Sequence, residues 1–247
     1  MANPRGPTSR AVLDIAWDSP VYQPTVTEAA DGRSRSVQAK NALATPEAFA
    51  FIAKEDPRPL LVLRECLTCT GTDDALLTKQ ADNEKTMLMS RWFHCVKVSP
   101  AVLEENDWLA NLFPGDDPSH LFVARPDGSG RIDLAGDQSR TELWDSMEAL
   151  LSSEYKDEPK GSLKGLLRLL DEFDEVDLEI AQLEQKLDDV IEKDGPESKK
   201  VKKIKRELTD LFAEKNDLRA KAVKVSELEL KPREKQAQAA ASPKQSS

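Results

Sequence analysis

Short apolar segments alternate with polar turns across residues 43–155. Thr45 is a favourable N-cap residue and Pro46 fits the first turn of a helix, so a helix is predicted to begin there. Apolar runs rich in branched residues predict strands, and Asp127-Gly128 predicts a tight turn between two of them. The predicted elements are a helix at 45–56, a strand at 59–65, a helix at 73–80, a strand at 91–99, a hairpin at 120–136 and a helix at 140–151. This order indicates an α/β sandwich of roughly a hundred residues.

A different pattern begins at Leu166, where apolar residues recur at alternating spacings of three and four. This heptad spacing predicts a long helix that packs against another helix along its length. Gly195 is expected to end the first helix and Pro196 to begin the second. The first apolar seam comprises Leu166, Leu169, Phe173, Val176, Ile180, Leu183, Leu187 and Val190, and the second comprises Val201, Ile204, Leu208, Leu211, Leu218, Ala222 and Val225, with Lys215 breaking the pattern once.

Two such helices joined by a short turn are predicted to fold back as an antiparallel coiled-coil hairpin. Charges support an antiparallel direction. The acidic residues of 171–179 would lie near Lys215, Arg219, Lys221 and Lys224, and those of 188–192 would lie near the basic residues of 199–203. Further apolar residues flank the seam and predict a strip that another helix could cover. These flanking residues are Leu163, Leu167, Leu170, Leu178 and Phe212. The hairpin is therefore expected to bind a protein partner or a second copy of the chain.

The two ends of the chain differ from the α/β domain and the hairpin in composition. Residues 1–42 form a predicted N-terminal arm, partly disordered, in which the alternation at 11–17 predicts an edge strand. Residues 231–247 have little to bury and predict a disordered tail. The predicted organisation is thus an arm at 1–42, an α/β domain at 43–155, a coiled-coil hairpin at 161–230 and a tail at 231–247.

The charge and composition of the chain argue against several classes of ligand and against a membrane location. A formal net charge of −10 would repel phosphates, so nucleic acid is a disfavoured ligand, and the lysine-rich segment 198–206 is better explained by the acidic helix before it. No stretch approaches the roughly 18 to 20 apolar residues of a membrane span, and the first residues do not resemble a signal peptide. We therefore expect a cytoplasmic protein with no membrane contact. No phosphate-binding glycine loop or nucleophile elbow appears, so no cofactor is expected.

Cys66 and Cys69 are three positions apart, directly after the predicted strand at 59–65. A thiol between the end of a strand and the start of a helix meets unpaired N–H groups and a partial positive charge, which stabilise a thiolate. In that arrangement Cys66 attacks a disulfide and Cys69 resolves the mixed disulfide. Two alternatives stay open, namely thiols that only fill a core and a metal site shared with His94 and Cys95.

The metal alternative requires Cys66 and Cys95 to lie close together. If the two strands are parallel neighbours, Cys66 stands at the end of one and Cys95 near the start of the other, well over ~10 Å apart. The sequence therefore predicts no metal site. Cys95 is then a small buried apolar residue, and His94 and His120 are structural or surface histidines.

Several segments together resemble a thioredoxin-fold domain over residues 43–155. They are "TPEAFAFIAKEDPRP", "LLVL", the Cys-x-x-Cys pair, "NEKTMLMSRWFHCVKVS" and "DDPSHLFVARPDGSGRIDLAG". In that family a proline before the third sheet strand adopts a cis peptide and faces the cysteine pair. Pro118 stands at this position, so the resemblance implies that Asp117 and Pro118 pack beside Cys66 and position a substrate backbone.

The sequence departs from the family at two places. The tryptophan and glycine that usually flank the first cysteine are missing from "RECLTC", residues 64–69. The buried acid that thioredoxins place six residues before the first cysteine is Leu60, which removes the usual proton acceptor. Glu65 is the nearest substitute, although a neighbouring carboxylate also raises the pKa of a thiol.

Two classes of function follow. In the first, the chain is a cytoplasmic thiol-disulfide oxidoreductase or redox sensor that acts on a protein thiol or disulfide, and the hairpin recruits the partner. In the second, the chain is a non-enzymatic adaptor, in which the α/β domain is a rigid platform and the hairpin is the binding surface. The reactivity of Cys66 distinguishes the two.

Overall fold

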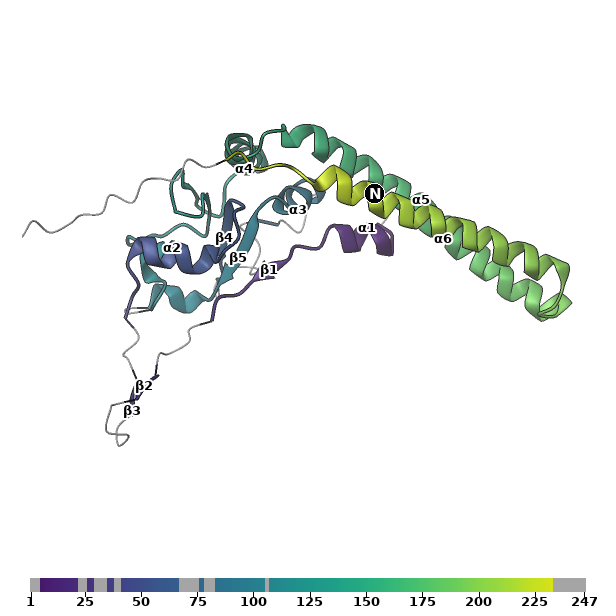
Figure 1. Ribbon diagram of the computed structural model, residues 1–247, viewed down its shortest axis with the longest axis horizontal. Coiled ribbons are helices and arrows are strands. Elements are labelled where there is room, and N and C mark those ends of the chain that lie inside the picture. The colour runs from purple at the N-terminus through teal and green to yellow at the C-terminus, as the bar shows by residue number, and fades with distance from the viewer. Residues whose placement is uncertain are drawn as a thin grey trace, which may run out of the picture.

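A mixed five-stranded sheet and a long helical hairpin make up most of the molecule in this computed structural model (Figure 1). A separate two-stranded sheet pairs β2 (Val26–Glu28) antiparallel with β3 (Arg35–Val37). The predicted mixed α/β class, followed by long C-terminal helices, is confirmed. The structure describes residues 5–21, 26–28, 35–37, 41–66, 76–77, 83–104 and 107–232.

The strands of the larger sheet follow the order β1-β5-β4-β6-β7. The central strands β4 (Leu60–Arg64) and β5 (His94–Val98) are parallel, and the edge strand β1 (Trp17–Asp18) is parallel to β5. On the other side, β6 (Leu121–Ala124) is antiparallel to β4, and β7 (Ile132–Leu134) is antiparallel to β6. The hairpin predicted at 120–136 is therefore confirmed.

The apolar run of β4 places this strand at the centre of the sheet. All of its residues are buried, as expected for a strand covered on both faces. Leu61 and Leu63 contribute to one hydrophobic core, and Leu60 and Val62 contribute to the other. Because successive side chains point to opposite faces of a strand, the two cores lie on opposite sides of the sheet.

Helices cover both faces of the sheet. The core that contains Leu60 includes residues of α2 (Thr45–Ala53), whereas the core that contains Leu61 includes residues of α3 (Glu84–Ser90) and α4 (Arg140–Glu154). Two 3₁₀ turns, η1 (Pro100–Leu103) and η2 (Ala110–Leu112), follow β5.

The first helix of the domain begins close to its predicted position. Its N-cap is Ala44 rather than Thr45, and Pro46 lies in the first turn as expected. The backbone N–H of Ala44 donates to Glu47 Oε2 at 3.3 Å, and this capping contact places the helix start one residue earlier than predicted. The helix predicted at 73–80 falls outside the described residues except for positions 76–77.

The two long helices are α5 (Pro159–Asp194) and α6 (Lys199–Ser226), which lie side by side (Figure 1). Gly195 ends α5 with a φ of +81°, as the sequence predicted. The prediction that Pro196 begins the second helix is wrong. Ser198 is its N-cap, because the Ser198 hydroxyl accepts a hydrogen bond from the N–H of Val201 at 3.2 Å.

Lys215, which interrupts the apolar seam, forms an ion pair between the helices. Its Nζ lies 2.7 Å from Oδ1 of Asp177, and the two side chains are only 15% and 6% exposed. The predicted pairing of Lys215 with the acidic segment 171–179 is therefore confirmed. Near the turn, Lys200 pairs with Asp194 rather than with residues 188–192, because Asp194 lies closer to the turn.

The predicted apolar strip beside the seam is mostly used inside the molecule. Leu163 and Leu170 are buried in the core that also contains Leu61, and Leu167 packs against that core. Leu178 and Phe212 are exposed. Of the predicted strip, only Leu178 and Phe212 stay available to another helix, because the first part of α5 packs onto the α/β domain, which the sequence pattern could not show.

The N-terminal arm also differs from its prediction. Residues 11–17 do not form one strand, since Ala11 and Val12 end a helix, α1 (Pro7–Val12), and only Trp17 of that segment joins β1. The helix packs against α5, far from it in sequence (Figure 1). The physical reason is that the part of the arm before Val12 finds its hydrogen-bond partners on α5, whereas Trp17 and Asp18 pair along the sheet edge.

Polar contacts attach the arm to the hairpin. Thr8 donates from its backbone N–H to Asp177 Oδ2 at 2.8 Å and from its hydroxyl to Asp177 Oδ1 at 2.9 Å. The N–H of Gly6 donates to Asp174 Oδ1 at 2.8 Å. A Cβ atom at Gly6 would come within 2.9 Å of Asp177 Oδ2, so only glycine permits this close approach. Arg5 adds ion pairs to Asp174 and to Glu84 of α3, so the arm links the hairpin to the domain.

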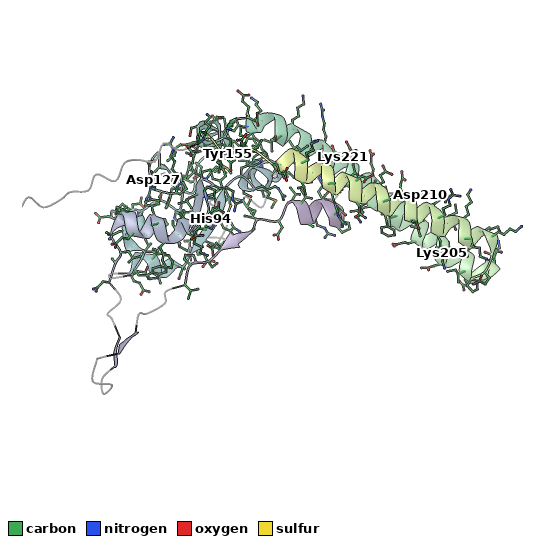
Figure 2. The ribbon with its side chains drawn as sticks, in the orientation of Figure 1. His94, Asp127, Tyr155, Lys205, Asp210 and Lys221 are labelled. Atoms are coloured by element: carbon green, nitrogen blue, oxygen red, sulfur yellow. The ribbon has the colours of Figure 1, made fainter. Side chains whose placement is uncertain are left out.

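The end of the hairpin returns to the domain. The indole N–H of Trp92 donates to the carbonyl of Ser226 at 2.9 Å, and Tyr155 bridges to Leu230. Tyr155 lies where the hairpin meets the α/β domain, whereas Lys205 lies toward the far end (Figure 2). One continuous core therefore runs from the sheet along the hairpin.

Acid is expected to weaken the attachment of the arm. Burial acts to raise the pKa of Asp177, but the hydrogen bonds from Lys215 and Thr8 lower it overall. A carboxylate with a lowered pKa in the folded state contributes stability above its ordinary value of 3.8, and this stability is lost as pH falls through the lowered value. We expect the free energy of unfolding, measured by urea titration, to drop less steeply with acid in Asp177→Asn than in the wild type. Equal pH dependence in the two proteins would contradict this.

None of the helices in the described part of the chain contains a stretch that is long and apolar enough to span a bilayer.

Candidate functional site

Cys66 follows the carboxyl end of the central strand β4. The backbone N–H of Glu65 donates to the carbonyl of Val98 at 3.0 Å, which extends the pairing of β4 with β5 by one residue. Cys66 is half-buried and disulfide-bonded. Cys69 lies outside the described residues. The sheet therefore brings Cys66 to the edge at which β4 and β5 both end.

Arg64 is a buried cation two residues before Cys66. It is 6% exposed, and its guanidinium donates from Nη2 to the carbonyl of Pro118 at 3.1 Å and from Nε to the carbonyl of Ser119 at 3.4 Å. Burial lowers the pKa of Arg64, and the nearby Asp117 opposes this shift. An arginine titrates so far above neutrality that it stays charged here. A fixed positive charge thus lies close along the chain to Cys66.

The loop that contains Asp117 and Pro118 meets the end of β4 through Arg64. Besides the side-chain contacts, the backbone N–H of Arg64 donates to the carbonyl of His120 at 2.8 Å. The predicted positioning residues Asp117 and Pro118 are therefore brought to the strand end that precedes Cys66. None of the described peptide bonds is cis, so the cis proline implied by the resemblance is absent, in keeping with the intrinsic preference for the trans form.

His120 belongs to the same group of residues. Burial lowers its pKa, the charge of Arg64 lowers it further, and Asp117 acts in the opposite direction. The imidazole is therefore expected to be neutral near neutral pH. A Cβ atom at Gly136 would lie 3.1 Å from the His120 ring, so the glycine leaves room for that ring.

This arrangement places a buried cation and a histidine with a lowered pKa at the strand end that precedes Cys66. The sequence reasoning missed Arg64 and treated His120 as a structural or surface residue. The signal that could have found Arg64 is a charged residue at the end of the otherwise apolar run "LLVLR".

Leu60 stands at the position, six residues before Cys66, where the thioredoxin family has a buried acid. Leu60 is fully buried in the core beneath α2, so no carboxylate occupies it. Glu65, the substitute considered from the sequence, is half-buried beside Cys66. Glu65 and Arg64, which directly precede Cys66 in the chain, carry opposite charges.

Cys95 and His94 are placed away from Cys66. Cys95 pairs with Leu61 in the parallel register, five residues before Cys66, which corresponds to roughly 15 Å along a strand. Burial raises the pKa of the free Cys95 thiol to about 12. His94 Nε2 lies 3.2 Å from Asp18 Oδ2. Among the described residues, no group of three or more His, Cys, Asp or Glu side chains could hold a metal ion.

Comparisons of this chain with models of protein families, with curated proteins and with solved structures found no match.

Proposed function

We propose that this chain is a thioredoxin-like thiol-disulfide exchange protein or redox sensor, in which Cys66 is the nucleophile and Cys69 the resolving thiol. The observation that carries the proposal is the location of Cys66, a disulfide-bonded residue at the carboxyl end of a central strand. A mixed sheet with helices on both faces supports a thioredoxin-like sandwich. Asp117 and Pro118, on the adjoining loop, are proposed to position a substrate backbone.

The exchange proceeds in two steps. The Cys66 thiolate attacks one sulfur of a substrate disulfide, and the other substrate sulfur leaves as a thiolate that takes a proton from water. The Cys69 thiolate then attacks the Cys66 sulfur of the mixed disulfide, which releases the second substrate thiolate and forms a Cys66–Cys69 disulfide. The substrate gains two electrons and the protein loses two. Two molecules of a small thiol of the glutathione class return the protein to its reduced form and leave as their own disulfide.

Arg64 is proposed to act as a positioning residue for this chemistry. Its guanidinium holds the loop through the carbonyls of Pro118 and Ser119, and its charge favours the Cys66 thiolate. The hairpin is proposed to recruit the protein that carries the substrate disulfide, or a second copy of the chain. Its exposed apolar residues Leu178 and Phe212 support a contact with another protein.

Alkylation kinetics test the proposal. We expect reduced Cys66 to react with iodoacetamide with an apparent pKa below the free-thiol value of about 8.5, read by peptide mass spectrometry. Arg64→Gln should raise that apparent pKa, because it removes the nearby cation. Cys95 is the internal control, since a buried thiol with a pKa of about 12 should react only when the protein opens.

A glutathione series completes the test. The wild type should form a reversible intramolecular disulfide, and Cys69→Ser should instead accumulate a mixed disulfide between Cys66 and glutathione. Slow alkylation of Cys66, with no disulfide at any accessible potential, would contradict thiol-disulfide exchange. That outcome would favour the second class of function, a non-enzymatic adaptor whose hairpin is the binding surface.

A further inference from the structure

A cavity of about 230 Å³ lies where the arm, the domain and the end of the hairpin meet. The arm contributes Asp14 and Ala16, and the end of α6 contributes Ser226. The domain contributes residues from the segment around the start of β5 and from the turn before β4. These domain residues are Arg58, Ser90, Arg91, Phe93 and Cys95. The cavity is distinct from the Cys66 site, because Cys95 and Cys66 lie at opposite ends of the parallel strands.

Arg91 is the cation in this cavity without an anionic partner. Its Nη1 donates to the carbonyl of Val12 at 3.1 Å, but its Nε is buried and has no hydrogen-bond partner. No carboxylate lies within ion-pair distance of Arg91 in the described part of the chain, and burial lowers its pKa. A half-buried guanidinium without a counter-charge loses hydration without full compensation, so an anion in the cavity would restore the lost electrostatic interaction.

The other polar groups around the cavity are already engaged. Arg58 forms hydrogen bonds from Nε and Nη2 to Asp56, and its Nη1 donates to the carbonyl of Arg91 at 3.1 Å. The hydroxyls of Ser90 and Ser226 donate to backbone carbonyls. Asp14 is exposed and contributes the opposing negative charge. Among the residues that line the cavity, the uncompensated positive charge therefore belongs to Arg91.

We propose that this cavity binds a small oxyanion of the phosphate class, with Arg91 as the residue that holds it. The guanidinium fits such a ligand because its planar N–H groups match the oxygen atoms of phosphate. Since the arm, the domain and α6 all line the cavity, a bound oxyanion would strengthen the junction between them. Asp14 reduces the affinity through its charge.

A titration with inorganic phosphate tests the site, with ionic strength held constant by chloride. In the ¹⁵N-labelled full chain, the Nε–H resonance of Arg91 should shift and saturate at millimolar phosphate. Arg91→Gln should weaken binding, measured by calorimetry, by at least about tenfold, because hydrogen bonds to charged groups are the strong ones. Arg219→Gln, on the exposed surface of α6, is the matched control and should leave binding unchanged.

Asp14→Asn provides an independent readout that does not depend on the stability of the Arg91 variant. It should tighten phosphate binding several-fold, because a repelling charge is removed from the cavity. Glycerol phosphate, titrated in parallel, separates the two sources of the ligand: binding of both compounds indicates a phosphomonoester, and binding of phosphate alone indicates the free ion. An unchanged Arg91 resonance, or equal weakening by Arg91→Gln and Arg219→Gln, would overturn the proposal.

Discussion

Phe173→Ala is expected to lower the free energy of unfolding by about 3–5 kcal/mol, because it removes a large side chain from a closely packed core. Phe173 is fully buried on α5, in the core that also contains Leu61 of the central strand. The loss should therefore affect the sheet and the hairpin together. Urea titrations followed by circular dichroism, which reports the helices, and by tryptophan fluorescence, which reports the four tryptophans outside the hairpin, should show the same shift.

Phe212→Ala is the matched control for this measurement. Phe212 is 44% exposed on α6, so its truncation should change the free energy of unfolding by less than about 0.5 kcal/mol. If Phe173→Ala shifted the circular dichroism transition and left the fluorescence transition in place, the hairpin and the domain would unfold independently. That result would contradict the continuous core seen in the structure.

Asp177→Ala is expected to have the second large effect and to lower the free energy of unfolding by about 3 kcal/mol. The substitution leaves Lys215 half enclosed between two helices without its counter-charge, and it removes both acceptors of Thr8. The cost of an unpaired, partly buried charge exceeds the cost of the missing attraction alone. The expected measurement is a urea titration together with limited proteolysis of the arm, which should become faster.

Two further variants make this prediction specific. Asp171→Ala removes a carboxylate that is 69% exposed and pairs with Arg5, so it should cost less than about 1 kcal/mol. Asp177→Leu combined with Lys215→Leu should recover most of the lost stability, because an apolar pair can replace a buried ion pair. If the double variant were less stable than Asp177→Ala, the hydrogen bonds to Thr8 rather than the unpaired Lys215 would dominate the loss.

The candidate site was only partly accessible from the sequence. Cys66 was singled out because its spacing from Cys69 and its place after an apolar run are local features. Pro118 was found through the resemblance, yet its contact with the strand end depends on Arg64, which lies 54 residues away. The lowered pKa of His120 likewise depends on burial and on the charge of Arg64, which is distant in sequence. Such side-chain neighbours follow from strand pairing, which local patterns do not specify.

The sequence by itself determined the elements whose signals are local. Apolar runs produced β4 and β5, a turn residue produced the hairpin of β6 and β7, and Gly195 ended α5, because burial and backbone conformation are set within a few residues. Heptad spacing likewise produced α5 and α6, since one apolar face needs a partner along its whole length.

Only the tertiary structure decided what those elements contact. Lys215 looks like a defect in a heptad until Asp177 faces it, and the arm becomes α1 because Asp177, 169 residues from Thr8, accepts its hydrogen bonds. The flanking leucines of α5 looked available to a partner, yet the domain covers Leu163 and Leu170. Each of these contacts joins residues that are distant in sequence. Their partners come together only when the chain has folded, so local patterns do not specify them.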